Sequence, residues 1–428
     1  MLKMVETFSG IGAQAKALSN IHDNYGYDFD ILRTADWDIN AIIAYDLIHN
    51  KNQKKSKYDK MNKEELLENL FAKSLNLSTD GKSPATKEAI ERLNINVLRK
   101  LCYAIDNSKN LISITDIHGD DLPDDMNILT YSFPCQDLSI ARAWHGASGG
   151  IDRNANNRSS MLWQIERILK ERKAKHLKMP RFLLMENVRN IQSKEHEANF
   201  KAWQDSLKEL GYYNHVYRLN SKDFGIPQNR VRVYMISYLI DDDKKLENEI
   251  ENYIDNHNLE NNNYVQTLGI KHKTVKDLLR TDYSKPTYKY EADVNQIHNT
   301  KSRKQICNDN PTLFDNNKYI DLVPTITTKQ DRNPNSGVIK YDNHVKGKCD
   351  FRYLTPRECF LLMGFEEKDF QVLLDNNFEN NKRGLFFSDA KLIKMAGNSI
   401  VVPVLEEIFK QINYINDNIY PKDIDWYY

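Results

Sequence analysis

Short apolar runs that alternate with helical patterns constrain the fold of the first 238 residues more than any other feature. Seven segments have the length and apolar character of buried strands: residues 2–8, 29–35, 111–115, 127–133, 182–186, 214–219 and 231–238. One intervening segment, residues 160–172, places its apolar side chains at helical spacing. Strands that alternate with helices predict an α/β fold with a mostly parallel sheet.

The first predicted strand ends in a glycine-rich turn. Gly10 and Gly12 precede an Ala-rich helix, and glycines there let the backbone approach a ligand near the free N–H groups of the helix N-terminus. Asp36, which ends the next strand, is placed to bond ribose hydroxyls, and Trp37 offers a flat face for a purine. This pattern suits a nicotinamide dinucleotide and S-adenosyl-L-methionine equally, and the same turn occurs in α/β proteins that bind neither.

Polar residues stand at the ends of three other predicted strands. Cys135 follows one strand, Glu186 and Asn187 end another, and Arg230 and Arg232 are expected to share one face at the start of a third. Each alone has a structural explanation, since a lone cysteine is usually a small buried hydrophobe. Together, a thiolate, a carboxyl group and an arginine suit addition to an electron-poor ring. Cytosine offers C6 to the thiolate, N3 and its amine to the acid, and O2 to the arginine.

Composition excludes several classes of protein. The five cysteines are scattered without CxxC spacing, which predicts neither a metal site nor a disulfide framework. No apolar run is long enough for a membrane span, and the N-terminus has no signal-peptide pattern, so we expect a cytoplasmic protein. The formal net charge of zero neither supports nor excludes nucleic acid, because a local basic surface is sufficient.

Changes in amino-acid composition along the sequence divide the chain into segments. The Lys/Asn/Glu-rich residues 51–110 are expected to be an insertion in a first domain, residues 1–238. Residues 239–350 predict a second, smaller domain of irregular strands and loops, and residues 271–350 within it hold fifteen Lys and Arg against ten Asp and Glu. Residues 351–390 are expected to end that domain as a hinge, and residues 391–428 to return a helix to the first domain.

Eight short stretches, taken in order, resemble the DNA (cytosine-5)-methyltransferase family of the bacterial restriction–modification type. They are "FSGIG", "ADW", "TDI", "FPCQ", "MENV", "QNRVRVYMIS", "RYLTPRECFLLMGF" and "AGNSIVVPVL". The resemblance covers nearly all of the chain outside residues 51–110 and 239–320. It implies a Rossmann-like methyltransferase domain with a mixed sheet, a target-recognition domain over residues 239–350, and S-adenosyl-L-methionine as cofactor.

The resemblance also implies roles for individual residues. Cys135 would be the nucleophile, Glu186 would bind N3 and the amine, and Arg232 would contact O2, with Arg230 supporting the site. Asn187 and Gln136 would hold the loops around them. Thirteen positions would frame the cofactor: Phe8, Ser9, Gly10, Ile11, Gly12, Asp36, Trp37, Asp116, Ile117, Pro134, Met161, Asn398 and Ser399. Asp36 replaces the glutamate that the family usually has at the ribose.

The target carbon cannot be reached inside a stacked duplex, so the base must be flipped out and covered by a loop. Residues 137–158, which are polar and contain glycine, fit such a mobile loop, and the arginines within it are expected to meet phosphates. The predicted DNA contacts are Ser139, Arg142, Arg158, Thr325, Ile326, Thr327, Lys329 and Arg332. The expected partners are double-stranded DNA and a restriction endonuclease that acts separately, with the enzyme itself a monomer.

Other functions explain less of the sequence. A nicotinamide-dependent dehydrogenase would account for Gly10 to Asp36 but not for Cys135, Glu186 and Arg232 together. A DNA-binding regulator without activity is disfavoured because every catalytic position is filled. An RNA cytosine methyltransferase is the closer competitor, since its catalytic residues would be identical, but the large recognition domain favours duplex DNA.

Overall fold

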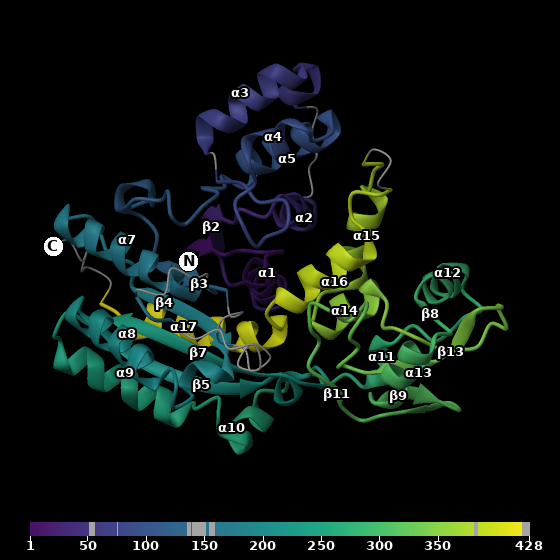
Figure 1. Cartoon of the computed structure of the whole chain (residues 1–428). Coiled ribbons are helices and arrows are strands. Elements are labelled where there is room, and N and C mark those ends of the chain that lie inside the picture. The colour runs from purple at the N-terminus through teal and green to yellow at the C-terminus, as the bar shows by residue number, and fades with distance from the viewer. Residues whose placement is uncertain are drawn as a thin grey trace. The chain divides into compact units, whose positions relative to one another are not determined.

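The computed structural model describes residues 1–50, 56–74, 76–134, 138, 151–153, 159–380 and 384–421. The chain forms two compact units (Figure 1). Unit 1 comprises Met1–Leu219, Val231–Leu268 and Leu405–Tyr428, and unit 2 comprises Asn220–Arg230 and Gly269–Val404. Residues 239–268 belong to unit 1, so the division falls later along the chain than the boundary predicted at residue 239. Among the described residues, no helix is both long enough and apolar enough to cross a membrane.

The core of unit 1 is a mixed six-stranded sheet with the order β2-β1-β3-β4-β7-β5. Its strands are β1 (Leu2–Thr7), β2 (Phe29–Ala35), β3 (Ile128–Tyr131), β4 (Phe182–Val188), β5 (Tyr212–Asn220) and β7 (Val231–Leu239). The pairs β1–β2, β1–β3 and β3–β4 are parallel, whereas β4–β7 is antiparallel. Apart from one segment, these strands match the predicted ones within a few residues, and the predicted α/β fold with a mixed sheet is confirmed.

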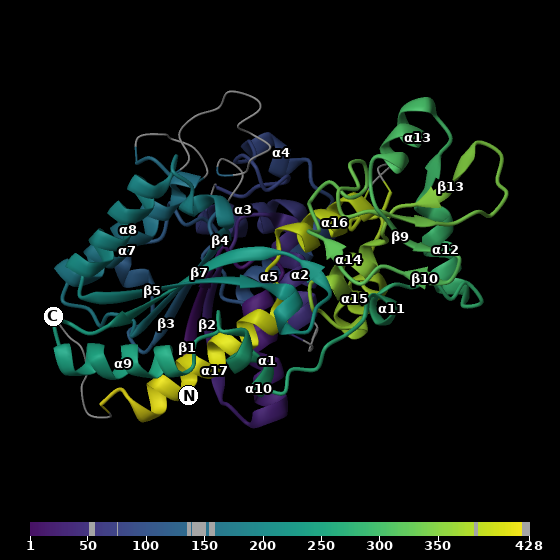
Figure 2. The same cartoon turned by 90° about the horizontal axis from the view of Figure 1, so that it is seen from below.

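Helices cover both faces of this sheet. The helices that lie wholly or mostly in unit 1 are α1 (Ala13–Tyr25), α2 (Ile39–His49), α3 (Lys63–Lys73), α4 (Lys87–Glu91), α5 (Ile95–Asn107), α7 (Leu162–Ala174), α8 (Glu197–Glu209), α9 (Lys244–Asn256), α10 (Asn262–Thr267) and α17 (Val402–Asn418). Figure 2 shows α7 and α8 on one face, with α9 and α17 on the other. Apolar side chains of α7 and α8 pack with those of β3, β4 and β7 in one buried cluster. The insertion forms α3, α4 and α5, which gather beside α2 (Figure 1).

The strand predicted over residues 111–115 is wrong. Leu111 N donates to Thr34 O at 2.8 Å, which begins a pairing with β2. The pairing ends there because the side chain of Asn110 accepts a hydrogen bond from Ile112 N at 2.6 Å and Ile112 has φ 65°. A β-branched residue rarely adopts this left-handed conformation, which turns the chain out of the sheet.

Unit 2 is built from short elements. A five-stranded sheet has the order β10-β9-β12-β13-β8, and β6 pairs in parallel with β11. The strands are β6 (Gln228–Asn229), β8 (Gln296–His298), β9 (Thr312–Asp315), β10 (Lys318–Tyr319), β11 (Val323–Pro324), β12 (Val338–Lys340) and β13 (Lys348–Arg352). The helices are α11 (Val275–Leu278), α12 (Pro286–Val294), α13 (Lys301–Asn308), α14 (Pro356–Leu362), α15 (Glu367–Asp375) and α16 (Asp389–Asn398).

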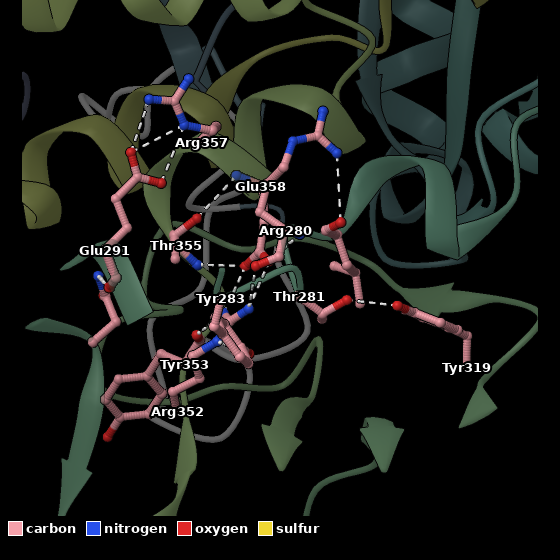
Figure 3. A network of polar contacts seen from close by, with 12 residues as sticks. Arg280, Thr281, Tyr283, Glu291, Tyr319, Arg352, Tyr353, Thr355, Arg357 and Glu358 are labelled. Atoms are coloured by element: carbon pink, nitrogen blue, oxygen red, sulfur yellow. Dashed lines mark hydrogen bonds and ion pairs between the residues drawn. The ribbon is translucent and has the colours of Figure 1, made fainter. Parts of the chain in front are cut away.

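A buried ion pair organises unit 2 (Figure 3). Arg352 and Glu358 are both 0% exposed and form two hydrogen bonds of 2.8 Å each. Glu358 also accepts from the backbone N–H groups of Thr355 and Arg280, each at 2.8 Å. Burial acts to raise the pKa of Glu358, but Arg352 and these donors together hold it below its ordinary value. The stretch "RYLTPREC" therefore ties α14 to β13 and to the chain before α12.

Candidate active site

The strand order of unit 1 contains a topological switch point. The chain passes from β1 to its neighbour β2 on one side and from β3 to its neighbour β4 on the other side, so the connections that follow β1 and β3 run in opposite directions. Ligands bind outside the carboxyl ends of strands at such a switch point. The glycine turn after β1 and the segment Phe133–Pro134 after β3 both follow these ends.

The two glycines of the turn have different surroundings. Gly12 begins α1 with φ 74°, and a Cβ built on it would lie 2.3 Å from Nε2 of His49 and 2.6 Å from a ring carbon of Tyr45. Gly10 has φ 53°, but no heavy atom of the described residues, chain neighbours aside, lies within 4 Å of its Cβ position. The turn therefore packs tightly at Gly12 and is open at Gly10.

Asp36 joins the end of β2 to the glycine turn. Its Oδ2 accepts a hydrogen bond from Gly10 N at 2.8 Å, and its Oδ1 accepts from Asp38 N at 2.8 Å. Trp37, beside it, is half-buried. Asp38 accepts from Asn40 N at 3.0 Å and caps α2. The arrangement places the Asp36 carboxylate beside the glycine turn.

A buried acid that the sequence did not point to lies beneath this turn. Glu6 in β1 accepts a hydrogen bond from the hydroxyl of Tyr45 at 3.1 Å, and the backbone N–H groups of Gln14 and Ala15 also bond to it. Burial raises the pKa of Glu6 to about 8, and the nearby charge of Asp36 adds to the rise against these hydrogen bonds. Glu6 is therefore a neutral carboxylic acid near pH 7, which joins β1 to α1 and α2.

Glu186 and Arg232 lie side by side on the neighbouring strands β4 and β7. Arg232 Nε is 3.3 Å from Glu186 Oε1, and their side chains are 15% and 12% exposed. In the register of the sheet, Val188 pairs with Arg232 and Glu186 pairs with Tyr234. The sheet thus brings together an acid and an arginine that are 46 positions apart in the sequence, and leaves both partly open to a ligand.

Asn187 and Ser159 fix the chain after β3. Asn187 is buried and donates to the carbonyl of Phe133 at 3.1 Å, and the Ser159 hydroxyl donates to the carbonyl of Pro134 at 2.7 Å. Met161, two residues after Ser159, packs against the buried apolar cluster of unit 1. These bonds hold the backbone that leads to position 135.

Arg230 and Arg232 belong to different units. Arg230 precedes β7, and its buried guanidinium donates to the carbonyls of Ile326, Gly397 and Ser399 at 2.9, 3.1 and 2.8 Å, all within unit 2. Arg232 pairs with Glu186 in unit 1. The two arginines therefore do not lie in one strand as expected, because the strand begins only at Val231.

Gln228, which had no predicted role, organises the segment around Thr325 and Ile326. Its buried amide donates to Leu362 O at 2.7 Å and accepts from Ile326 N at 2.9 Å. Thr325 donates its hydroxyl to Asn229 O at 2.6 Å. The side chain of Ile326 is buried, and Thr327 lies next to it, against Gly397 of α16. Unit 2 thus holds this turn by both its backbone and its side chains.

Several other predicted residues fall into three groups. Asp116 is exposed and accepts hydrogen bonds from the insertion, whereas the Ile117 side chain is buried in the core. Lys329 and Arg332 are exposed in unit 2, which also contains Asn398 and Ser399. The predicted residues that lie outside the described ones are Cys135, Gln136, Ser139, Arg142 and Arg158.

One arginine of the predicted loop has a partner other than the expected phosphate. The guanidinium of Arg153 bonds to both carboxylate oxygens of Glu166, at 2.5 and 2.6 Å, and lies over the ring of Trp163 at 3.8 Å. Trp163 also donates to the carbonyl of Ile151 at 2.9 Å. Residues 151–153 are therefore fastened to α7.

The donor set of the glycine turn fits S-adenosyl-L-methionine. Open space at Gly10 leaves room for a ligand close to the backbone, and the carboxylate of Asp36 bonds to the N–H of this glycine. The described residues contain no group of three or more His, Cys, Asp or Glu that could hold a metal ion. The described side chains at this edge thus include an acid and an arginine that lie side by side.

Comparisons with known proteins agree with this geometry. Residues 83–414 match the model of the family described as C-5 cytosine-specific DNA methylase. The Type II methyltransferase M2.ScrFI of Lactococcus lactis subsp. cremoris is 33% identical over 414 residues, which cover 96% of this chain and 99% of that protein. The orphan methyltransferase M.SssI of Spiroplasma monobiae is 30% identical over 424 residues, covering 96% and 97%. The fold is similar to that of the S. pombe Dnmt2 methyltransferase, with TM-score 0.56 and 18% identity over 98% of this chain and 100% of that one.

Proposed function

Because the chain belongs to the family of C-5 cytosine-specific DNA methylases, as the sequence resemblance predicted, we propose that it methylates C5 of a flipped-out cytosine in duplex DNA with S-adenosyl-L-methionine. The observation that carries the proposal is the pairing of Glu186 with Arg232 at the sheet edge, 3.3 Å apart, beside the strand that leads to position 135. An acid and an arginine held together there match the N3 and O2 edge of cytosine.

The residues of the glycine turn would hold the cofactor. Gly10 leaves room for it, Asp36 is placed for the ribose hydroxyls, and Trp37 and Asp116 for the adenine. When bound, S-adenosyl-L-methionine supplies an electrophilic methyl group on a sulfonium sulfur.

The chain's own residues activate the ring of the cytosine. The Cys135 thiolate adds to C6, a proton on Glu186 is shared with N3, and the Arg232 guanidinium neutralises charge at O2. This addition makes C5 a carbon nucleophile. After C5 has been methylated, loss of its proton and expulsion of the Cys135 thiolate restore the aromatic ring.

The base must leave the duplex before Cys135 can reach it, at a cost of roughly a few kcal/mol. Unit 2, with exposed Lys329 and Arg332, is the proposed target-recognition domain. We propose that the enzyme binds double-stranded DNA as a monomer and that any restriction endonuclease partner acts separately. Size-exclusion chromatography with light scattering, with and without DNA, tests the monomer.

Bisulfite sequencing of DNA from cells that express the protein is the direct test of the function. We expect 5-methylcytosine in one recurrent sequence context, and none with Cys135→Ser. DNA containing 5-fluorocytosine should become covalently attached to the wild-type protein, since the fluorine cannot leave as a proton does, and Cys135→Ser should form no such adduct. Methyl transfer to tRNA that exceeds transfer to DNA, or full methylation by Cys135→Ser, would overturn the proposal.

A further inference from the structure

The insertion contacts the backbone of the residues proposed to hold the adenosine. Ser78 is fully buried, its N–H donates to Trp37 O at 2.8 Å, and its carbonyl accepts from Ile39 N at 3.0 Å. These two bonds make a parallel bridge between Ser78 and Asp38. The insertion thus forms an isolated β-bridge to the residue that follows Trp37, just after the end of β2.

The same segment holds the carboxylate of Asp116. The amide of Asn76 donates to both of its oxygens, at 2.8 and 3.0 Å, and the hydroxyl of Ser74 donates to Oδ2 at 2.8 Å. Thr115 adds a third donor at 3.0 Å. The Ser74 hydroxyl also accepts from Asn76 N at 2.9 Å, so the two insertion donors are fixed relative to one another.

These contacts limit the motion of an exposed acid. An exposed aspartate ordinarily samples several rotamers, whereas donors on both oxygens fix the plane of the Asp116 carboxylate. The four contacts use the roughly four lone-pair positions of the carboxylate, but the Asn76 amide is shared between both oxygens. If that amide keeps one of its two contacts, one lone pair can accept a ligand amine, and the insertion still orients the carboxylate.

We propose that Ser74 and Asn76 are positioning residues that orient Asp116 toward the exocyclic amine of the cofactor's adenine. The insertion is then part of the methyl donor's site and not only a decoration of the surface. This inference rests on the proposed function, since it takes S-adenosyl-L-methionine as the ligand.

Calorimetric binding of two ligands to the whole protein tests the proposal. The ligands are S-adenosylhomocysteine and its 6-deamino analogue, in which hydrogen replaces the adenine amine. The wild-type protein should bind the amine-bearing ligand about tenfold more tightly. Asn76→Ala and Ser74→Ala should each remove most of that preference while leaving the affinity for the deamino analogue within about twofold.

Further variants separate positioning from folding. Asn76→Asp places a second carboxylate against Asp116 and should weaken binding of the amine-bearing ligand further, whereas Ser74→Thr keeps the hydroxyl and should restore the wild-type affinity. Thr86→Ala removes the cap of α4 in the same insertion without touching Asp116, and should leave both affinities unchanged.

The outcomes distinguish two failures. If Asn76→Ala weakens both ligands equally, or weakens neither, the positioning role is overturned while the proposed function stands. If the wild-type protein binds neither ligand, the proposed function fails and the inference fails with it. Ser74→Ala and Ser74→Thr with equal affinities for both ligands would also overturn the positioning role.

Discussion

Three acids near the glycine turn have different surroundings. Glu6 is buried and bonded to a hydroxyl and to backbone N–H groups, Asp36 accepts two backbone N–H groups, and Asp116 is exposed but held by side-chain donors. Burial without a positive partner and a nearby like charge both favour the neutral form of a carboxyl group. Glu6 has both, so its protonation should respond to pH in the neutral range.

Glu6→Gln should change how stability depends on pH. The folded pKa of Glu6 is raised to about 8, so the folded protein binds this proton more tightly than the unfolded chain does. The free energy of unfolding of the wild-type protein should therefore fall as pH rises between 4.5 and about 8. The free energy of unfolding of the wild-type protein, minus that of Glu6→Gln, should decrease by up to about 1.4 kcal/mol per pH unit over this range. Urea unfolding measures both values.

An exposed acid on the insertion is the matched control. Glu64 lies on the surface of α3, and Glu64→Gln should keep the wild-type pH profile. Parallel stability profiles for Glu6→Gln and the wild-type protein would show that Glu6 is charged when folded.

Local sequence pattern identified the strand ends but not their distant partners. Glu186 could be placed near the end of a strand because it follows an apolar run, and Arg232 near the start of a strand because it precedes one. Glu6 has the pattern of an ordinary strand residue, and its burial arises from α1 and α2 packing over β1. Asn76 lies 40 positions before Asp116, and no local periodicity relates the two. Gln228 likewise acts on segments about 98 and 134 positions away.

In the glycine turn, Gly10 and Gly12 both lack a side chain, but for different structural reasons. Gly12 begins α1 against His49 and Tyr45, so its missing side chain serves packing. Gly10 faces open space among the described residues, so its missing side chain leaves room beside the backbone that the proposed cofactor would use.

Gly12→Ala and Gly10→Ala should separate these roles. A methyl group at Gly12 overlaps the His49 ring and should lower the free energy of unfolding by about 3 kcal/mol or more. At Gly10 only the left-handed conformation is penalised, by about 1–2 kcal/mol, but binding of S-adenosylhomocysteine should be lost. Urea unfolding and calorimetry measure the two effects. Equal losses of stability for both variants would contradict this division.

Most elements of unit 1 could be predicted because period-two and period-3.6 patterns are local. The exception, residues 111–115, has the composition of a strand, but the Asn110 side chain captures Ile112 N and turns the chain. Arg230 was expected in β7, but three carbonyls of unit 2 bind it. A local side-chain hydrogen bond overrides the strand preference in the first case, and tertiary hydrogen bonds do so in the second.

At the scale of the whole molecule, each compact unit contains its own buried arginine. In unit 2, Arg352 pairs with Glu358. In unit 1, Arg172 is fully buried and donates to the carbonyls of Gly119 and Leu122 at 2.6 and 2.8 Å, and to Asp124 at 2.8 Å. Each arginine therefore contributes to the stability of one unit.

In calorimetric unfolding, Glu358→Gln and Arg172→Met should each lower the transition of a different unit. Glu358→Gln leaves the Arg352 charge buried without its counter-ion and should destabilise unit 2 by about 3–5 kcal/mol. Arg172→Met leaves buried carbonyls unsatisfied and should shift the transition of unit 1 instead. A single transition that moves equally in both variants would mean that the two units unfold as one.

The hydrogen bonds that Asp36 accepts have a kinetic consequence. Because Gly10 N–H and Asp38 N–H already hold this carboxylate, the turn is in its final shape before any nucleoside arrives. Little conformational entropy then remains to be lost on association. The methyl donor should enter in a single fast phase without a slow rearrangement, and exchange with its demethylated product should be limited only by how quickly each dissociates.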